Sequence, residues 1–243
     1  MSSGSIAAVG SGEYLTSMLE LESLLLADGV AKGKRPVYVQ LATAAGLEGI
    51  DSRQYWQRLG QEQAERLGVE VRFLPVFNRA DAESDEFIEV ARDAALIYFS
   101  GGDPYHLANT MRGTILWQTI QDNFNSGGSL GGCSAGAMFL SSQVPRVRFT
   151  TKPPVPGVGL LPNLQVIPHF NMIHKFVPDA AVRALSDVPE GVMLVGIDDE
   201  TSLVRRGQDW SVWGSGKVHI LNGDSPRTYE HAEIVTGPFT ASN

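Results

Sequence analysis

The segment with the clearest chemical potential is a five-residue turn, residues 132–136, which reads Gly-Cys-Ser-Ala-Gly. It has the G-x-S-x-G pattern, in which a serine lies on a sharp strand-to-helix turn whose strained backbone requires small neighbours. The residues around Ser134 are small, and an apolar helix start, Met-Phe-Leu, follows them. The pattern predicts that Ser134 is a nucleophile. The N–H of Ala135 and the positive end of the following helix would then face an oxyanion.

Cys133 is the alternative nucleophile, because a thiol on such a turn is the working group of amidotransferase-like hydrolases. A motif centred on Cys133 would have Ala135 where the second glycine belongs. The spacing therefore favours Ser134 and predicts that Cys133 is a small buried residue behind it. As the only cysteine of the chain, Cys133 also excludes an internal disulfide framework and a multi-cysteine metal site.

A serine nucleophile needs a base, and His169 is the preferred candidate among the histidines. It follows the apolar run Val-Ile-Pro, and α/β sheets present their functional side chains at such strand ends. His174 is the nearest rival and is equally a candidate for substrate binding. An esterase that uses a histidine of the C-terminal tail is a weaker alternative. The full set of histidines is His106, His169, His174, His219 and His231.

The carboxylate that would orient the histidine must follow it in the chain. Between Ser134 and Asp179 there is no Asp or Glu, so the expected order is Ser, His, then acid. Three adjacent acids follow the apolar run MLVGI, and Asp199, Asp198 and Glu200 are the candidates. We expect one of the three carboxylates within hydrogen-bonding distance of a ring nitrogen of the base.

A glycine pair after the apolar run ALIYF is a second source of backbone donors. Glycine lets the backbone approach a ligand closely, so the N–H of Gly102 is predicted to be the second oxyanion donor, beside that of Ala135. Asp103, the next residue, is a candidate for substrate binding.

The elements that must position these residues alternate between strands and helices over the first 140 residues. This alternation predicts βαβ units, a mostly parallel sheet covered on both faces, and one domain over residues 1–243. Prolines interrupt the chain after Ser141, and the tail is expected to form hairpin-like strands at 191–204 and 209–220. The predicted strands are 5–9, 36–41, 69–76 and 95–99, and the predicted helices are 13–26, 51–67, 85–94 and 105–123.

Composition narrows the class of protein further. The chain has 243 residues, with 19 basic and 27 acidic side chains and a net charge of −8. This balance argues against a nucleic-acid or anionic-membrane binder. The chain has no run of about 18 apolar residues and no basic, apolar leader at its start, so we expect a cytoplasmic, soluble protein.

One segment departs from the acidic average. From Ala135 to Pro178 the chain has basic residues and no acid. Arginine binds carboxylates through paired hydrogen bonds, so the segment is suited to an anionic substrate group, with Arg146 and Arg148 as the candidate contacts. The basic residues of the segment are Arg146, Arg148, Lys152 and Lys175.

Taken together, four motifs in this order resemble the dipeptidase E and cyanophycinase family of serine peptidases. The motifs are SGGDPYHL (100–107), GCSAGA (132–137), LLPNLQVIPHF (160–170) and LVGIDDETSLV (194–204). The resemblance implies the fold of the class I glutamine amidotransferases, a flavodoxin-like α/β three-layer sandwich with a mostly parallel central sheet. The resemblance also implies that catalysis needs no metal or cofactor. It further implies a small peptide substrate and a monomeric or homodimeric protein.

The same resemblance implies roles for individual residues. Ser134 would be the nucleophile and His169 the base, with oxyanion N–H groups from Gly102 and Ala135. The family often has a glutamate at the position of Asp199, so this chain has the shorter acid there and Glu200 remains an alternative. Members of the family cleave either dipeptides that begin with aspartate or a β-aspartyl–arginine polymer, and both substrates present an aspartyl unit.

Overall fold

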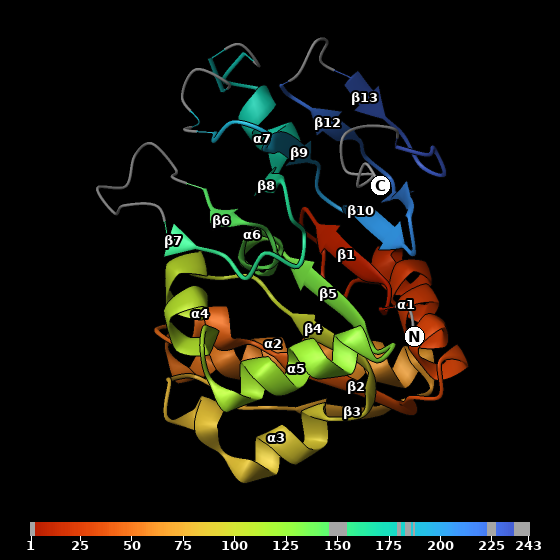
Figure 1. The fold of residues 1–243 in the computed structure, drawn as a ribbon, viewed down its shortest axis with the longest axis vertical. Helices are drawn as coiled ribbons and strands as arrows, with labels where there is room; N and C mark the ends of the chain where they lie inside the picture. The colour runs from red at the N-terminus through yellow and green to blue at the C-terminus, as the bar shows by residue number, and fades with distance from the viewer. Residues whose placement is uncertain are drawn as a thin grey trace.

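The computed structural model describes residues 3–145, 155–178, 181–182, 186, 188–222 and 227–235, and its centre is a seven-stranded sheet (Figure 1). Strands β1, β5, β4, β2 and β3 are parallel, while β10 is antiparallel to β1, and β11 to β10. Apolar runs form these strands, and β1, β4 and β5 are buried along their whole length. From edge to edge the order is β11 (Asp209–Gly214), β10 (Thr201–Arg206), β1 (Ile6–Val9), β5 (Ser129–Cys133), β4 (Ala94–Phe99), β2 (Arg35–Leu41) and β3 (Glu70–Phe73).

Helices cover both faces of this sheet, and the alternation of side chains along β1 shows the two sides. Ala7 and Val9 pack in one apolar cluster with residues of α1 (Leu19–Ala31) and α2 (Ile50–Leu67). Ile6 and Ala8 pack in the other, with residues of the remaining large helices. These are α3 (Asp85–Ala91), α4 (Pro104–Met111), α5 (Ile115–Asn125) and α6 (Ala135–Leu140). The predicted α/β three-layer fold with a mostly parallel sheet is confirmed.

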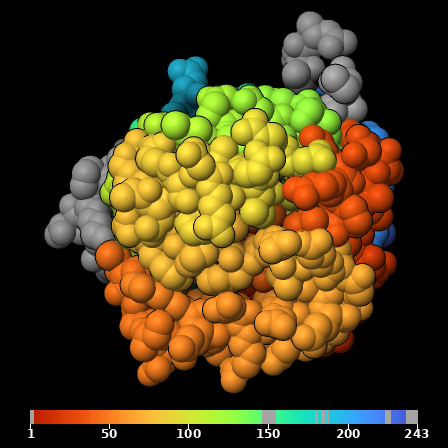
Figure 2. All heavy atoms as spheres, turned by 90° about the horizontal axis from the view of Figure 1, so that it is seen from below, coloured from red at the N-terminus to blue at the C-terminus, as the bar shows by residue number. Residues whose placement is uncertain are grey.

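A smaller sheet is formed by the second half of the chain. Its order is β13 (Arg227–Tyr229), β12 (Val218–Ile220), β9 (Met193–Ile197) and β8 (Leu164–Ile167), and β8 and β9 are parallel. The short helix α7 (Phe170–His174) follows β8, and β6 (Gln143–Val144) pairs with β7 (Val155–Pro156). The small sheet lies at the opposite end of the molecule from α3 (Figure 1). The view from the α3 end shows mainly red to green atoms of the N-terminal half (Figure 2).

The tail differs from the sequence prediction in one respect. Only β10 and β11 form a hairpin within the large sheet. Strands β9 and β12, which flank this hairpin in the sequence, pair with each other in the small sheet instead. The two predicted hairpin-like segments are therefore divided between two sheets.

Two predicted helices also differ from the structure, besides α3 and β3, which end at Ala91 and Phe73 rather than at 94 and 76. The helix expected at 13–26 begins only with the 3₁₀ turn η1 (Thr16–Met18) and α1, so residues 10–15 form a loop, called here the β1 loop. The helix expected at 105–123 is two helices, because Gly113 has a φ of +69° and the Thr114 side chain caps α5. The two other 3₁₀ turns are η2 (Thr43–Ala45) and η3 (Asp81–Glu83). Within the described residues, no helix combines the length and apolar character needed to cross a bilayer.

Candidate active site

The predicted nucleophile, base and acid lie just beyond the carboxyl ends of three strands. Ser134 follows β5 of the large sheet, while His169 follows β8 and Asp199 follows β9 of the small sheet. Parallel strands of α/β proteins gather functional groups at this edge. Because β8 and β9 are paired in parallel with Ile167 opposite Gly196, the segments that follow them start side by side.

The three side chains form a continuous hydrogen-bonded chain. Ser134 Oγ lies 3.1 Å from His169 Nε2, and His169 Nδ1 lies 2.8 Å from Asp199 Oδ1. The His169 side chain is 46% exposed and that of Asp199 is 30% exposed, so the group opens to solvent. This arrangement lets an imidazole take the serine proton while a carboxylate stabilises the resulting imidazolium.

The backbone at Ser134 has the strained form expected for a nucleophile on a sharp turn. Its φ is +50° and its ψ is −107°, a combination rare for a residue with a side chain. A Cβ at Gly132 would lie 2.6 Å from the carbonyl carbon of Gly136, and one at Gly136 would lie 2.4 Å from Phe99 O, so both positions require glycine. The N–H of Ser134 donates to Val9 O at 2.9 Å, which fixes the turn to β1.

Two backbone segments border the serine. Ala135 is the first residue of α6, where N–H groups have no acceptor within the helix. Gly102 has a φ of +135°, and a Cβ there would lie 2.5 Å from the carbonyl carbon of Ala44. The glycine before it, Gly101, would place a Cβ 3.4 Å from that of Ser134. The loop after β4 thus lies against the nucleophile, with little space for a side chain.

Among the three adjacent acids, only Asp199 contacts His169 in the structure. Asp198 turns the other way: its Oδ1 lies 3.1 Å from His219 Nε2, and its Oδ2 accepts from Lys217 N at 3.0 Å. Glu200 has a φ of +50°, and its Cγ lies 2.9 Å from the place a Cβ on Gly12 would take. The predicted contact between a carboxylate and the base is therefore present.

The Asp199 carboxylate is held in its ionised form. Partial burial raises the pKa, but hydrogen bonds from Ser11 and His169 outweigh burial and hold the pKa of Asp199 below its ordinary value. Ser11 Oγ donates to Asp199 Oδ1 at 2.6 Å, and the Asp199 N–H donates to the side chain of Asn171 at 3.1 Å. An ionised acid is the form that can accept the Nδ1–H of His169.

Cys133 lies behind the serine, as its small size suggests. It is fully buried, and its Sγ donates to Glu13 Oε2 at 2.8 Å. Burial, followed by the Glu13 charge, raises the pKa of the thiol well above its usual range. A buried, protonated thiol is a poor nucleophile, so the geometry favours Ser134.

The remaining predicted site residues lie around this group or outside the described residues. His174 is on α7, where its ring packs with those of Phe170 and His219. The Asp103 side chain caps α4 by accepting from the backbone N–H groups of Tyr105 and His106, at 2.8 and 3.1 Å. Arg146 and Arg148 lie outside the described residues.

Three residues around this group, Ser11, Glu13 and Asn171, were not predicted from the sequence. Each acts through a contact with a segment far away in the chain, so no local spacing marks it. The only available signal was the glycine-rich break after β1, GSG, at the edge where the site forms. In the described part of the chain, no group of three or more His, Cys, Asp or Glu side chains is arranged to hold a metal ion.

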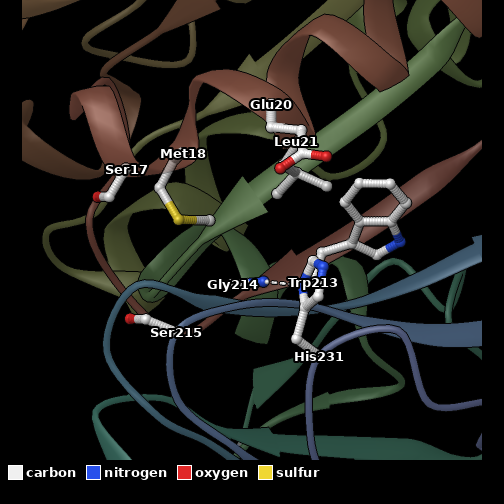
Figure 3. Close-up of a pocket in the computed structure, with 8 residues that line it drawn as sticks. All are labelled: Ser17, Met18, Glu20, Leu21, Trp213, Gly214, Ser215 and His231. Carbon is white, nitrogen blue, oxygen red and sulfur yellow. Dashed lines mark hydrogen bonds between the residues drawn. The ribbon is translucent and has the colours of Figure 1, made fainter.

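A separate cavity of about 300 Å³ lies between the start of α1 and the end of β11 (Figure 3). The backbone N–H of Gly214 donates to His231 Nδ1 at 3.2 Å beside it. Ser134, His169 and Asp199 are not among its lining residues, so this cavity is distinct from the group described above. Its lining residues are Ser17, Met18, Glu20, Leu21, Trp213, Gly214, Ser215 and His231.

The three-layer α/β fold, with a serine on a strained turn at the end of β5, fits a serine peptidase. The chain belongs to peptidase family S51, whose sequence profile matches residues 6–213. A crystal structure of a peptidase from an acI-B1 actinobacterium is 48% identical in sequence and superimposes with a TM-score of 0.90 over 97% of both chains. A Listeria monocytogenes EGD-e protein, provisionally named peptidase E, shares the fold with a TM-score of 0.65 at 16% identity, over 88% of this chain and 100% of its own.

The curated relatives are longer proteins. A cyanophycinase of Geminocystis herdmanii (strain PCC 6308) is 26% identical over 174 residues, which are 68% of this chain and 63% of the relative. A cyanophycinase of Synechococcus elongatus is 29% identical over 180 residues, 69% of this chain and 55% of the relative. The chain thus spans between half and two thirds of these relatives.

Proposed function

We propose that this S51 peptidase hydrolyses small aspartyl peptides through Ser134, His169 and Asp199. The observation that carries the proposal is the hydrogen-bonded chain of these three residues, with the serine on a strained turn. In the proposed reaction His169 Nε2 takes the proton of Ser134, whose Oγ attacks the peptide carbonyl. Asp199 keeps the other ring nitrogen protonated and stabilises the imidazolium.

The backbone N–H groups of Gly102 and Ala135 are the proposed donors to the oxyanion. Both belong to segments that border the serine, and backbone donors fixed in advance contribute most when charge develops on the oxygen. His169 then gives its proton to the leaving amine, and a water molecule activated by the same histidine hydrolyses the acyl-enzyme. This sequence of steps needs no cofactor.

The aspartyl preference rests on charge and on resemblance. The basic residues between Ala135 and Pro178, unaccompanied by any acid, suit a substrate carboxylate. The similarity to the cyanophycinases supports a second candidate, hydrolysis of β-Asp-Arg units. Both candidates share an aspartyl group and differ in which of its carboxyl groups forms the scissile bond.

The test is hydrolysis of Asp-X, Glu-X, Ala-X and β-Asp-Arg dipeptides by the wild type and by Ser134→Ala. We expect turnover of an aspartyl substrate that is lost in Ser134→Ala. Ser84→Ala, at the start of α3, is the control for serine removal, because its side chain makes no capping hydrogen bond. Turnover of β-Asp-Arg alone would favour the second candidate, and equal activity of wild type and Ser134→Ala would exclude the serine mechanism.

A further inference from the structure

The β1 loop carries a buried carboxyl group that the proposed mechanism does not use. Glu13 is only 6% exposed. Burying a carboxyl group is costly unless hydrogen bonds compensate it. A buried acid of this kind is therefore expected to have specific partners, and both of its oxygen atoms have them.

The two partners of Glu13 belong to two segments next to the nucleophile, a loop and a strand. Its Oε1 accepts from the backbone N–H of Gly101 at 2.7 Å, in the loop after β4. Its Oε2 accepts from Cys133 Sγ at 2.8 Å, at the end of β5 and directly before Ser134. One side chain thus connects the loop that presents Gly102 to the strand that presents the serine.

The loop after β4 is confined on three sides by these contacts. A Cβ on Gly101 would lie 3.0 Å from Glu13 Oε1 on one side and 3.4 Å from the Cβ of Ser134 on another. On the third side Asp103 N donates to Ala44 O at 2.9 Å. The contact from Glu13 holds the N–H of Gly101, the residue directly before the proposed oxyanion donor Gly102.

We propose that Glu13 is a positioning residue for acyl transfer: its carboxylate fixes the distance between the Gly102 N–H and Ser134 Oγ. The proposal rests on the serine mechanism given above. Glu13 does not touch the substrate; it acts through Gly101 and Cys133. A shift of about 1 Å in a donor or nucleophile can lower a rate by about 100-fold.

The test uses a covalent probe, so that it does not depend on knowing the peptide substrate. A fluorophosphonate phosphonylates a serine that is activated by its base and oxyanion donors, and the adduct is counted by intact-protein mass spectrometry. The rate is compared for wild type, Ser134→Ala, Glu13→Asp and Glu13→Gln. Thermal unfolding of each variant shows that labelling is measured on folded protein.

Glu13→Asp keeps the charge but is too short to reach both partners, so we expect labelling to slow by about 10- to 100-fold. Glu13→Gln keeps an oxygen for the Gly101 N–H, and its amide N–H can donate to Cys133 Sγ, a weak acceptor, so we expect it to label within about three-fold of wild type. Gln40→Asn is the matched control. Gln40 is also a buried polar side chain that the change shortens by one carbon, but it donates to Gly60 O at 2.9 Å and contacts neither Gly101 nor Cys133.

Each outcome has one meaning. Slow labelling of Glu13→Asp alone, with Glu13→Gln and Gln40→Asn near wild type, supports the proposal. Equal labelling of wild type and folded Glu13→Asp overturns it and leaves the serine mechanism intact. Equal slowing of Glu13→Asp and Gln40→Asn also overturns it, because shortening any buried polar side chain would then suffice. A wild type that is not labelled at Ser134 overturns both proposals.

Discussion

The hydroxyl of Ser11 donates to Asp199 Oδ1 at 2.6 Å, and the same oxygen atom lies 2.8 Å from His169 Nδ1. The acid is therefore held between a serine from the β1 loop and the histidine after β8. Two donors on one oxygen fix the position of the carboxylate. They do so although this aspartate is one carbon shorter than the glutamate that the family often has at this position.

Removal of the Ser11 hydroxyl should lower the catalytic rate. In Ser11→Ala we expect kcat to fall by about 10-fold, because the carboxylate loses one of the hydrogen bonds that orient it. Ser11→Thr keeps a hydroxyl and is the control. Steady-state kinetics on the aspartyl substrate measure the effect, and an unchanged kcat in Ser11→Ala would show that His169 alone orients the acid.

A second prediction concerns the charge of the acid. Asp199→Asn keeps the shape but offers either an amide N–H or a neutral oxygen to the histidine. We expect kcat to fall by about 10⁴-fold, as it does when a triad acid becomes an amide, because the imidazole loses its favoured tautomer. The same change in the neighbouring acid, Asp198→Asn, should lower kcat far less, since Asp198 pairs with His219. Equal losses would mean that the two acids act as one unit.

The choice between serine and thiol can be tested directly. Cys133→Ser retains a donor for Glu13, so we expect activity within about three-fold of wild type. Because Cys133 is fully buried with a raised thiol pKa, iodoacetamide should not inactivate the wild type. Activity lost in Cys133→Ser and in alkylated wild type would instead support the thiol alternative.

Glu22, the buried acid of α1, should make the free energy of unfolding depend on pH. Burial, together with the nearby charge of Glu13, raises the pKa of Glu22 to about 7, although hydrogen bonds from Tyr38 and Tyr14 oppose the increase. The folded pKa exceeds that of the unfolded chain, so folding retains a proton. The stabilising effect is complete below the unfolded value and is lost as the pH rises to about 7.

Glu22→Gln should remove this dependence. A rise in the pKa from its ordinary value of 4.5 to about 7 corresponds to a change in the free energy of unfolding on the order of 3 kcal/mol. We expect Glu22→Gln to be more stable than wild type at pH 8 by up to that amount, and close to wild type at pH 4.5. Urea unfolding at both pH values measures this. A stability difference that does not change with pH would contradict the shifted pKa.

The fold was predictable from the sequence where a strand is a continuous apolar run. Residues 36–41 and 95–99 were predicted almost to the residue, because buried parallel strands have no polar face. The helix predicted at 13–26 began too early, since the leucines of α1 give a periodic pattern that does not mark the start of the helix. Glu13 lies in the β1 loop instead, where its side chain contacts Gly101, 88 residues away in the chain.

The site was predictable to the extent that local rules apply. The small residues around Ser134 and the strand end before His169 follow from short-range sterics and topology. The identity of the acid does not, because Asp198, Asp199 and Glu200 are adjacent and chemically alike. Only the pairing of β12 with β9 directs Asp198 to His219 and leaves Asp199 for the base.

The division of the site between two sheets has a consequence for refolding. Ser11 and Asp199 are 188 residues apart in the chain, so their contact closes a loop of most of the protein. Loops of this length form slowly and late compared with local helices and turns. Helical content should therefore recover before Ser134 can again be phosphonylated. The delay between the two signals measures how long the small sheet takes to pack beside the large one.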